Sequence, residues 1–156
     1  MTKNGEFHNM NIYDNAKEVV SKSYDEIHLG DEETLTHVVT NEDVVTFAEL
    51  TGDVNPIHLD EEFAKNSFFK GRIAHGMLTA GFISTILGTR LPGTNTIYLA
   101  QNLKFTAPVR IDDTIKVIVK VIDKRDDKKI ITLETNIYNQ EEQKVVEGSA
   151  VVMKLE

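Results

Sequence analysis

The chain has 156 residues, which is enough for one compact domain with a hydrophobic core but too short for two comfortable ones. It contains no cysteine, which excludes disulfides, thiolate metal sites and a thiol nucleophile. Its formal net charge of −8 argues against broad binding to nucleic acid or to an anionic membrane surface. The N-terminus lacks the apolar core of a signal peptide, and no apolar run is long enough to span a bilayer, so we expect a soluble, cytoplasmic protein.

The first 25 residues predict a helical extension with no chemistry of its own. Asp14 can cap a short amphipathic helix. Its apolar side chains recur at helical spacing, at Ala16, Val19, Val20 and Tyr24. We therefore expect an extension over residues 1–25 and a single main domain over residues 26–156.

The next segment predicts a strand followed by two helices. Residues 35–39 have the composition of a strand, and Thr40 with Asp43 has the spacing of a capping box that opens a helix. That helix is expected to end at Gly52. Asp60 can cap a second, shorter helix. The acidic residues that follow it in the first turn interact favourably with the helix dipole.

Residues 76–88 predict a helix that is buried on all sides, because they include no charged residue and apolar side chains point in every direction. At 1.5 Å per residue this helix is only ~20 Å long, too short for a bilayer. Small residues allow the backbone of a sheet or a ligand to approach it closely, at Gly76, Ala80, Gly81 and Ser84.

The remainder of the chain alternates with a period of two, which indicates strands over residues 97–105, 114–122, 130–138 and 145–153. The last three are joined by short polar segments and should form an antiparallel meander. One buried helix and a curved sheet give an α+β fold in which the sheet wraps around the helix. Because a sheet with an exposed edge tends to pair with a partner, we expect a homodimer or a higher homo-oligomer.

Asp53 and His58 stand five residues apart, on either side of the stiff step from Asn55 to Pro56. Asp and His are common proton-transfer groups at neutral pH, and a rigid loop would hold them in place. The same residues are also ordinary signals for the end of a helix followed by a turn. From these residues alone, both interpretations remain open.

Several blocks of the sequence resemble one enzyme family. The run from Phe47 to His58 resembles the hydratase-2 motif of the MaoC-like, (R)-specific enoyl-CoA hydratases, and Ile73–Met77 resembles that family's second block. The blocks Leu91–Gly93, 97–99 and 103–105 continue the resemblance in the same order, which covers about residues 28–156. It implies the hot-dog fold, a curved antiparallel sheet wrapped around a central helix, in a single-hot-dog member.

The resemblance also implies roles for individual residues. Asp53 and His58 would be the pair that adds water reversibly to a trans-2-enoyl-CoA thioester, with Asp53 as the base and His58 as the proton donor, a division that can reverse. Asn55 would orient the loop or the water. The backbone N–H of Gly76 would stabilise the thioester oxyanion. Ser84 would either position the water or the pair by hydrogen bonding, or be a small helix residue that bonds the carbonyl of the preceding turn. The resemblance implies neither a cofactor nor a metal.

Three alternatives remain beside a hydratase. A hot-dog thioesterase and an acyl-carrier-protein dehydratase both commonly carry a carboxylate on the central helix, and residues 76–89 contain neither Asp nor Glu. A non-catalytic protein that binds acyl thioesters would not need the intact pair of Asp53 and His58. Leu87 and Val152 match positions that the family links to the acyl pocket, but we expect them in the core. For His75 we likewise expect a core or loop position.

Overall fold

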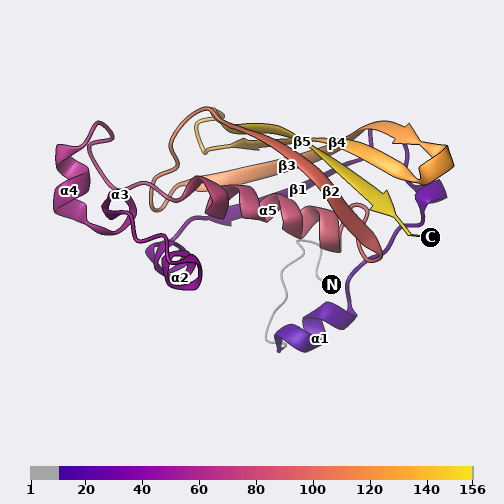
Figure 1. The fold of residues 1–156 in the computed structure, drawn as a ribbon, viewed down its shortest axis with the longest axis horizontal. Helices are drawn as coiled ribbons and strands as arrows, with labels where there is room; N and C mark the ends of the chain where they lie inside the picture. The colour runs from indigo at the N-terminus through magenta and orange to yellow at the C-terminus, as the bar shows by residue number, and fades with distance from the viewer. Residues whose placement is uncertain (1–10, 156) are drawn as a thin grey trace.

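The computed structural model describes residues 11–155 of the chain (Figure 1). Its helices are α1 (Ile12–Lys17), α2 (Asn41–Thr51), α3 (Pro56–Leu59), α4 (Glu61–Asn66) and α5 (Gly76–Thr89), with two short 3₁₀ turns, η1 (Tyr24–Glu26) and η2 (Asp126–Lys128). Its strands are β1 (Glu32–Val38), β2 (Thr96–Phe105), β3 (Thr114–Arg125), β4 (Ile130–Tyr138) and β5 (Lys144–Lys154).

The five strands form one antiparallel sheet in the order β1-β3-β4-β5-β2. This confirms the predicted meander of β3, β4 and β5. The alternating apolar side chains of β3 and β4 are fully or almost fully buried on one face of the sheet: Ile115, Val117, Val119, Val121, Ile131, Leu133 and Ile137. Helix α5 lies along one face of the sheet (Figure 1), and Ile83, Ile86 and Leu87 on this helix belong to the same hydrophobic core.

Helix α5 confirms the predicted element, but only one of its faces is buried in the single chain. The buried residues on this helix are Thr79, Ala80, Ile83, Ile86 and Leu87. The opposite face consists mostly of small side chains and is exposed, at Met77, Gly81, Ser84, Thr85 and Gly88. The sequence predicted burial all round because this face carries no charge, whereas the sheet of one chain covers one side of the helix only.

The N-terminal helix is shorter than expected and has a different cap. Its N-cap is Asn11, whose side chain accepts the N–H of Tyr13, and Asp14 instead bonds Lys17 within the helix. Val19, Val20 and Tyr24 lie beyond its end. Tyr24 is buried because its hydroxyl donates to Asp126 and its ring lies beside the ammonium of Lys124. The contacts with the main domain therefore begin before residue 25, and the domain boundary stays a prediction.

Helices α2, α3 and α4 lie together beyond the end of the sheet, near the start of α5 (Figure 1). The predicted capping box is confirmed, since Thr40 accepts the N–H of Asp43 and the Asp43 carboxylate accepts the N–H of Thr40. Gly52 ends α2 in the left-handed conformation, with φ 79°. Asp60 caps α4 as predicted. These caps fix where the intervening loop, residues 52–55, leaves and re-enters helical structure.

Between residues 11 and 155, no helix combines the length and the apolar character needed to cross a membrane.

Candidate active site

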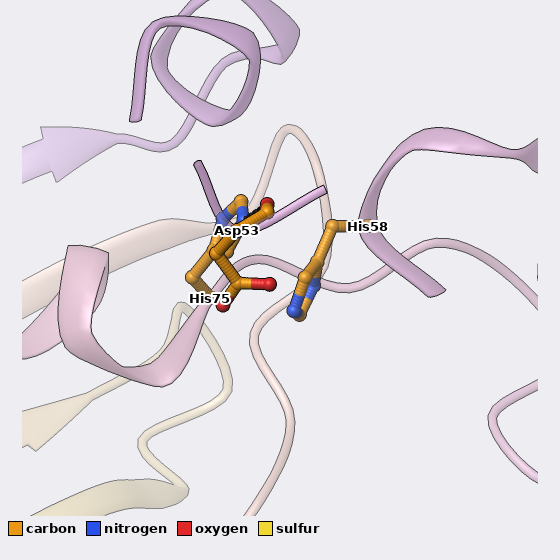
Figure 2. Close-up of side chains that lie close together, drawn as sticks. All are labelled: Asp53, His58 and His75. Carbon is orange, nitrogen blue, oxygen red and sulfur yellow. Dashed lines mark hydrogen bonds between the residues drawn. The ribbon is translucent and has the colours of Figure 1, made fainter. Parts of the chain in front are cut away.

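Three side chains from three elements meet where α2, α3 and α5 approach one another (Figure 2). Asp53 comes from the loop after α2, His58 from α3, and His75 is the N-cap residue of α5. One polar side-chain atom from each of the three lies within 4.8 Å of those from the other two. The structure therefore brings the predicted pair together and adds a second imidazole to it.

The loop that carries Asp53 is held mainly by local hydrogen bonds. The N–H of Asp53 donates to the Thr51 hydroxyl at 3.2 Å, and the N–H of Asn55 donates to the Asp53 carboxylate at 3.3 Å. The Asn55 side chain accepts the N–H of Ile57 at 3.1 Å and so caps α3, where Pro56 occupies the first helical position. Asp53 itself is exposed. Its carboxylate is thus accessible while its backbone is confined.

His58 is only 9% exposed, and its ring is oriented by a backbone carbonyl. Its Nδ1 lies 2.7 Å from the oxygen of Ile73, which can only accept, so Nδ1 carries the proton and Nε2 keeps a free lone pair. Burial of the imidazole lowers the pKa of His58, although the hydrogen bond to Ile73 and the charge of Asp53 act in the opposite direction. An uncharged imidazole with a free Nε2 is therefore favoured at neutral pH.

A cavity of about 560 Å³ opens beside these groups. This volume is typical of small-molecule sites. Its polar lining includes Asp53, His58, His75 and Thr79. Its apolar walls come from α2, the segment before α5, α5 itself, the ends of β2 and β5, and the loop after β2, through Phe47, Phe69, Ile73, Ala74, Met77, Phe105, Ala107, Pro108, Val109, Val145 and Val146. The arrangement suits a mostly apolar ligand whose reacting atoms lie next to an acid and an imidazole.

Gly76 lines this cavity as the first residue of α5. Within the described residues its N–H donates to no backbone or side-chain acceptor, as is usual for the first turn of a helix. A Cβ at this position would lie 2.8 Å from the ring of Phe105. A side chain at this position would have to displace the Phe105 ring, and glycine also leaves the N–H open to a ligand oxygen.

The other predicted residues lie away from the cavity in the single chain. Ser84 follows Gly76 by eight residues, about 12 Å along the helix axis, and is on the exposed face of α5. It makes no contact with Asp53 or His58 among those that the structure records. Leu87 and Val152 are buried in the hydrophobic core and do not line the cavity, so the expectation that they are core residues is confirmed.

Sequence reasoning missed Thr79 and understated His75. Thr79 is 1% exposed, lines the cavity, and its hydroxyl has no hydrogen-bond partner within the described residues. One sequence signal was available, because Thr79 follows Gly76 by three residues and so shares its helix face. His75 is buried as expected, but its ring contacts the rings of Phe47 and His58, and it lines the cavity.

Asp53, His58 and His75 also form a donor set that can ligate a divalent metal ion. The two imidazole rings lie 3.8 Å apart between centroids and are tilted by only 32°.

The comparisons with known proteins agree with this geometry. Residues 26–143 match the family model described as MaoC like domain. The (R)-specific enoyl-CoA hydratase of Rhodospirillum rubrum is 44% identical over 138 residues, which cover 88% of this chain and 95% of that protein. The (R)-specific enoyl-CoA hydratase of Aeromonas caviae is 46% identical over 110 residues, covering 70% of this chain and 82% of that protein.

Solved structures show the same architecture. An (R)-hydratase from A. caviae superimposes with a TM-score of 0.80 at 41% identity, covering 82% of this chain and 97% of that one. An unliganded R-hydratase from Pseudomonas aeruginosa gives a TM-score of 0.81 at 41% identity, covering 85% and 84%. With the helix and sheet described above, these matches confirm the predicted hot-dog fold, and the chain belongs to the MaoC-like domain family.

Proposed function

We infer that the protein is an (R)-specific enoyl-CoA hydratase, a hydro-lyase that adds water reversibly to trans-2-enoyl-CoA thioesters. One observation carries this inference: Asp53 and His58 meet at an apolar cavity beside the unbonded N–H of Gly76. The relatives named as hydratases, which this chain matches over most of its length, support the same activity.

We propose that one water molecule is held between the Asp53 carboxylate and Nε2 of His58. Both groups accept hydrogen bonds when Asp53 is ionised and His58 is uncharged, so together they can orient both hydrogens of the water. The water oxygen bonds to C3 of the substrate, and a proton from the same water reaches C2 through one of the two side chains. The lowered pKa of His58 keeps the imidazole uncharged at neutral pH, so that Nε2 can accept a hydrogen bond from the water, and either side chain can then pass a proton to C2.

Negative charge develops on the thioester oxygen while water adds to C3. The N–H of Gly76 at the start of α5 is directed to receive it, because the helix dipole and the unsatisfied N–H both favour an anion there. The apolar walls of the cavity exclude bulk water around this charge, which strengthens the hydrogen bond. Asn55 serves this site as the cap that keeps the loop and α3 in register.

A thioesterase is the second candidate, and α5 argues against it. Of the residues on this helix, the cavity is lined by Gly76, Met77 and Thr79, none of which can act as a carboxylate base. A non-catalytic acyl-thioester-binding protein would use the same cavity, and activity alone separates it from a hydratase.

We propose that two copies form a homodimer through the exposed face of α5 and the outer edge of β2. The β2 strand has a paired neighbour on one side only, and it exposes Ile97, Tyr98 and Leu99. A partner that covered α5 would bury the small side chains at Gly81, Ser84 and Gly88, which allow close approach, and would bring Ser84 near a second chain. Sedimentation equilibrium should then give twice the chain mass. A monomer would contradict this assembly.

The cytoplasmic location stays a prediction.

One assay tests the activity. The protein is incubated with crotonyl-CoA, and the absorbance of the conjugated thioester and the release of free CoA are followed together. We expect loss of absorbance, an (R)-3-hydroxy product and no free CoA, with both Asp53→Asn and His58→Gln at least about 100-fold slower. Release of free CoA together with crotonic acid, and without a 3-hydroxy product, would identify a thioesterase. Binding without either reaction would identify a binding protein.

A further inference from the structure

His75 is buried next to the catalytic pair, and its role is not explained by the helix that it begins. It occupies the N-cap position of α5, yet its side chain accepts no hydrogen bond from the first turn. A cap residue usually does so through an oxygen of Ser, Thr, Asp or Asn. His75 is also only 2% exposed. The side chain therefore serves something other than its own helix.

The hydrogen bonding of His75 defines its tautomer. Nε2 lies 3.0 Å from the backbone oxygen of Asp53, and a carbonyl oxygen can only accept, so Nε2 carries the proton. Nδ1 is buried and has no partner within the described residues. The imidazole thus donates one hydrogen bond to the loop that carries Asp53.

The ring of His75 also fixes the second member of the pair. It packs against the ring of His58, with ring centroids 3.8 Å apart, and also against the ring of Phe47, with centroids 4.7 Å apart. His58 is tied to Ile73 through Nδ1, so the packing against His75 limits rotation of the ring about that hydrogen bond. His75 consequently touches both catalytic residues from a third element.

This contact matters because the loop of Asp53 has few long-range restraints. The other hydrogen bonds of Thr51, Asp53 and Asn55 join residues at most four positions apart. The bond from His75 spans 22 positions and ties the loop to the start of α5, where Gly76 lies. One side chain therefore sets the distance between the carboxylate, the imidazole and the oxyanion donor.

We propose that His75 is a positioning residue for the hydration reaction, which holds the Asp53 backbone and the His58 ring in register with the N–H of Gly76. The proposal rests on the proposed function. His75 differs from a passive core residue because it makes a hydrogen bond to Asp53 and a ring contact to His58, the two residues that transfer protons.

The electrostatic surroundings of His58 provide a second readout. The charged or titratable groups that face it are Asp53, Arg72 and His75, and the Arg72 guanidinium donates to the His58 carbonyl oxygen. After burial, the positive charge that His75 carries when it is protonated is a further cause that lowers the pKa of His58. Removing the imidazole of His75 should therefore raise the pKa of His58, and with it the pH at which the rate falls on the acid side.

The experiment compares His75→Leu with His75→Gln in the full chain. Leucine keeps an apolar side chain of similar reach but cannot donate, whereas the amide of glutamine places a donor near the position of Nε2. We expect kcat for crotonyl-CoA to fall at least about 10-fold in His75→Leu, with KM changed by less than about threefold, because misplacement affects the reacting geometry more than binding. His75→Gln should recover most of that loss. In both variants, the acid side of the pH–rate profile should shift to higher pH.

His37→Leu is the matched control. His37 also makes one hydrogen bond, to Asp43 at 2.7 Å, and one ring contact, to Phe82 at 4.4 Å, but it lies outside the cavity lining. Its loss should lower stability without a change in kcat. An unchanged kcat in His75→Leu, a His75→Gln variant no faster than it, or an equal kcat loss in His37→Leu overturns the proposal.

A measurement on the unaltered protein covers the case in which His75→Leu does not fold. Nitrogen-15 NMR should show His75 with a proton on Nε2 and none on Nδ1. The reverse tautomer would overturn the proposal even with full activity. If the unaltered protein leaves crotonyl-CoA unchanged, the proposed function fails instead, and the NMR result still reports whether His75 holds the loop.

Discussion

The meander of β3, β4 and β5 and the segment 52–76 are held together in opposite ways. The meander has antiparallel pairing on both sides of β4, with a register shift on each side, and a row of fully or almost fully buried apolar side chains. The segment 52–76 carries the catalytic pair on an exposed loop and short helices, and a few directed hydrogen bonds determine its geometry. Stability is therefore spread over many contacts in the sheet, whereas the geometry of the site depends on single side chains.

The largest effect should come from a cavity in the meander. Ile137 on β4 is fully buried, so Ile137→Ala should cost about 2–5 kcal/mol in the free energy of unfolding, because the neighbouring strands cannot collapse into the space. The kcat per folded molecule should stay close to that of the unaltered protein. Chemical denaturation and crotonyl-CoA hydration measure the two quantities. A loss of kcat equal to that of Asp53→Asn would show that the two regions are not separate.

Two glycines sharpen the same contrast. A Cβ at Gly148 would lie 2.3 Å from the backbone oxygen of Asn102 in the neighbouring strand, whereas the atoms nearest to a Cβ at Gly76 belong to the half-exposed ring of Phe105. Gly148→Ala should therefore destabilise the fold by about 1–3 kcal/mol. Gly76→Ala should leave thermal stability closer to that of the unaltered protein but reduce kcat about 10-fold or more, because the methyl group obstructs the oxyanion position.

Thermal unfolding and kcat are measured in parallel for Gly148→Ala and Gly76→Ala. If Gly76→Ala unfolds more readily than Gly148→Ala, the ring of Phe105 cannot move and Gly76 has mainly a packing role. If Gly76→Ala keeps full activity, its N–H does not bind the thioester oxygen.

The pH dependence should report the burial of His58. Since the folded protein lowers the pKa of this group, the unfolded chain binds more protons below the ordinary value of about 6.5. Stability from this residue is complete above that pH and is lost as the pH falls through the lower, folded pKa. The free energy of unfolding, plotted against pH between 5 and 7, should thus have a smaller slope in His58→Gln than in the unaltered protein. Equal slopes would contradict the lowered pKa.

The smallest effect is expected at the start of α2, outside the lining of the cavity. Thr40→Ala removes the side-chain half of the capping box and should cost about 1 kcal/mol in the free energy of unfolding. Because α2 leads into the loop of Asp53, kcat tests whether the position of the loop depends on this cap. We expect no change in kcat, since Gly52 and His75 fix the loop at its other end.

The sequence by itself determined the elements and the family. The capping residues Thr40 and Asp60, the left-handed end of α2 at Gly52 and the period of two in β3 to β5 each express a local preference that survives folding. The uncharged helix over residues 76–88 and the alternating strands predicted the α+β class. The N-terminal helix was wrong in its cap and its length, because Tyr24 gains more from burial against Lys124 and Asp126 than from continuing a helix.

Only the tertiary structure decided how the site is assembled. Sequence spacing paired Asp53 with His58, but the contact of His75 with both joins residues 17 and 22 positions apart along the chain and depends on how α5 docks beside α2 and α3. The exposure of one face of α5 has a similar origin. An uncharged helix predicts burial, but which of its faces is covered depends on the single sheet that packs against it. Long-range packing sets these relations, and local sequence preference cannot encode them.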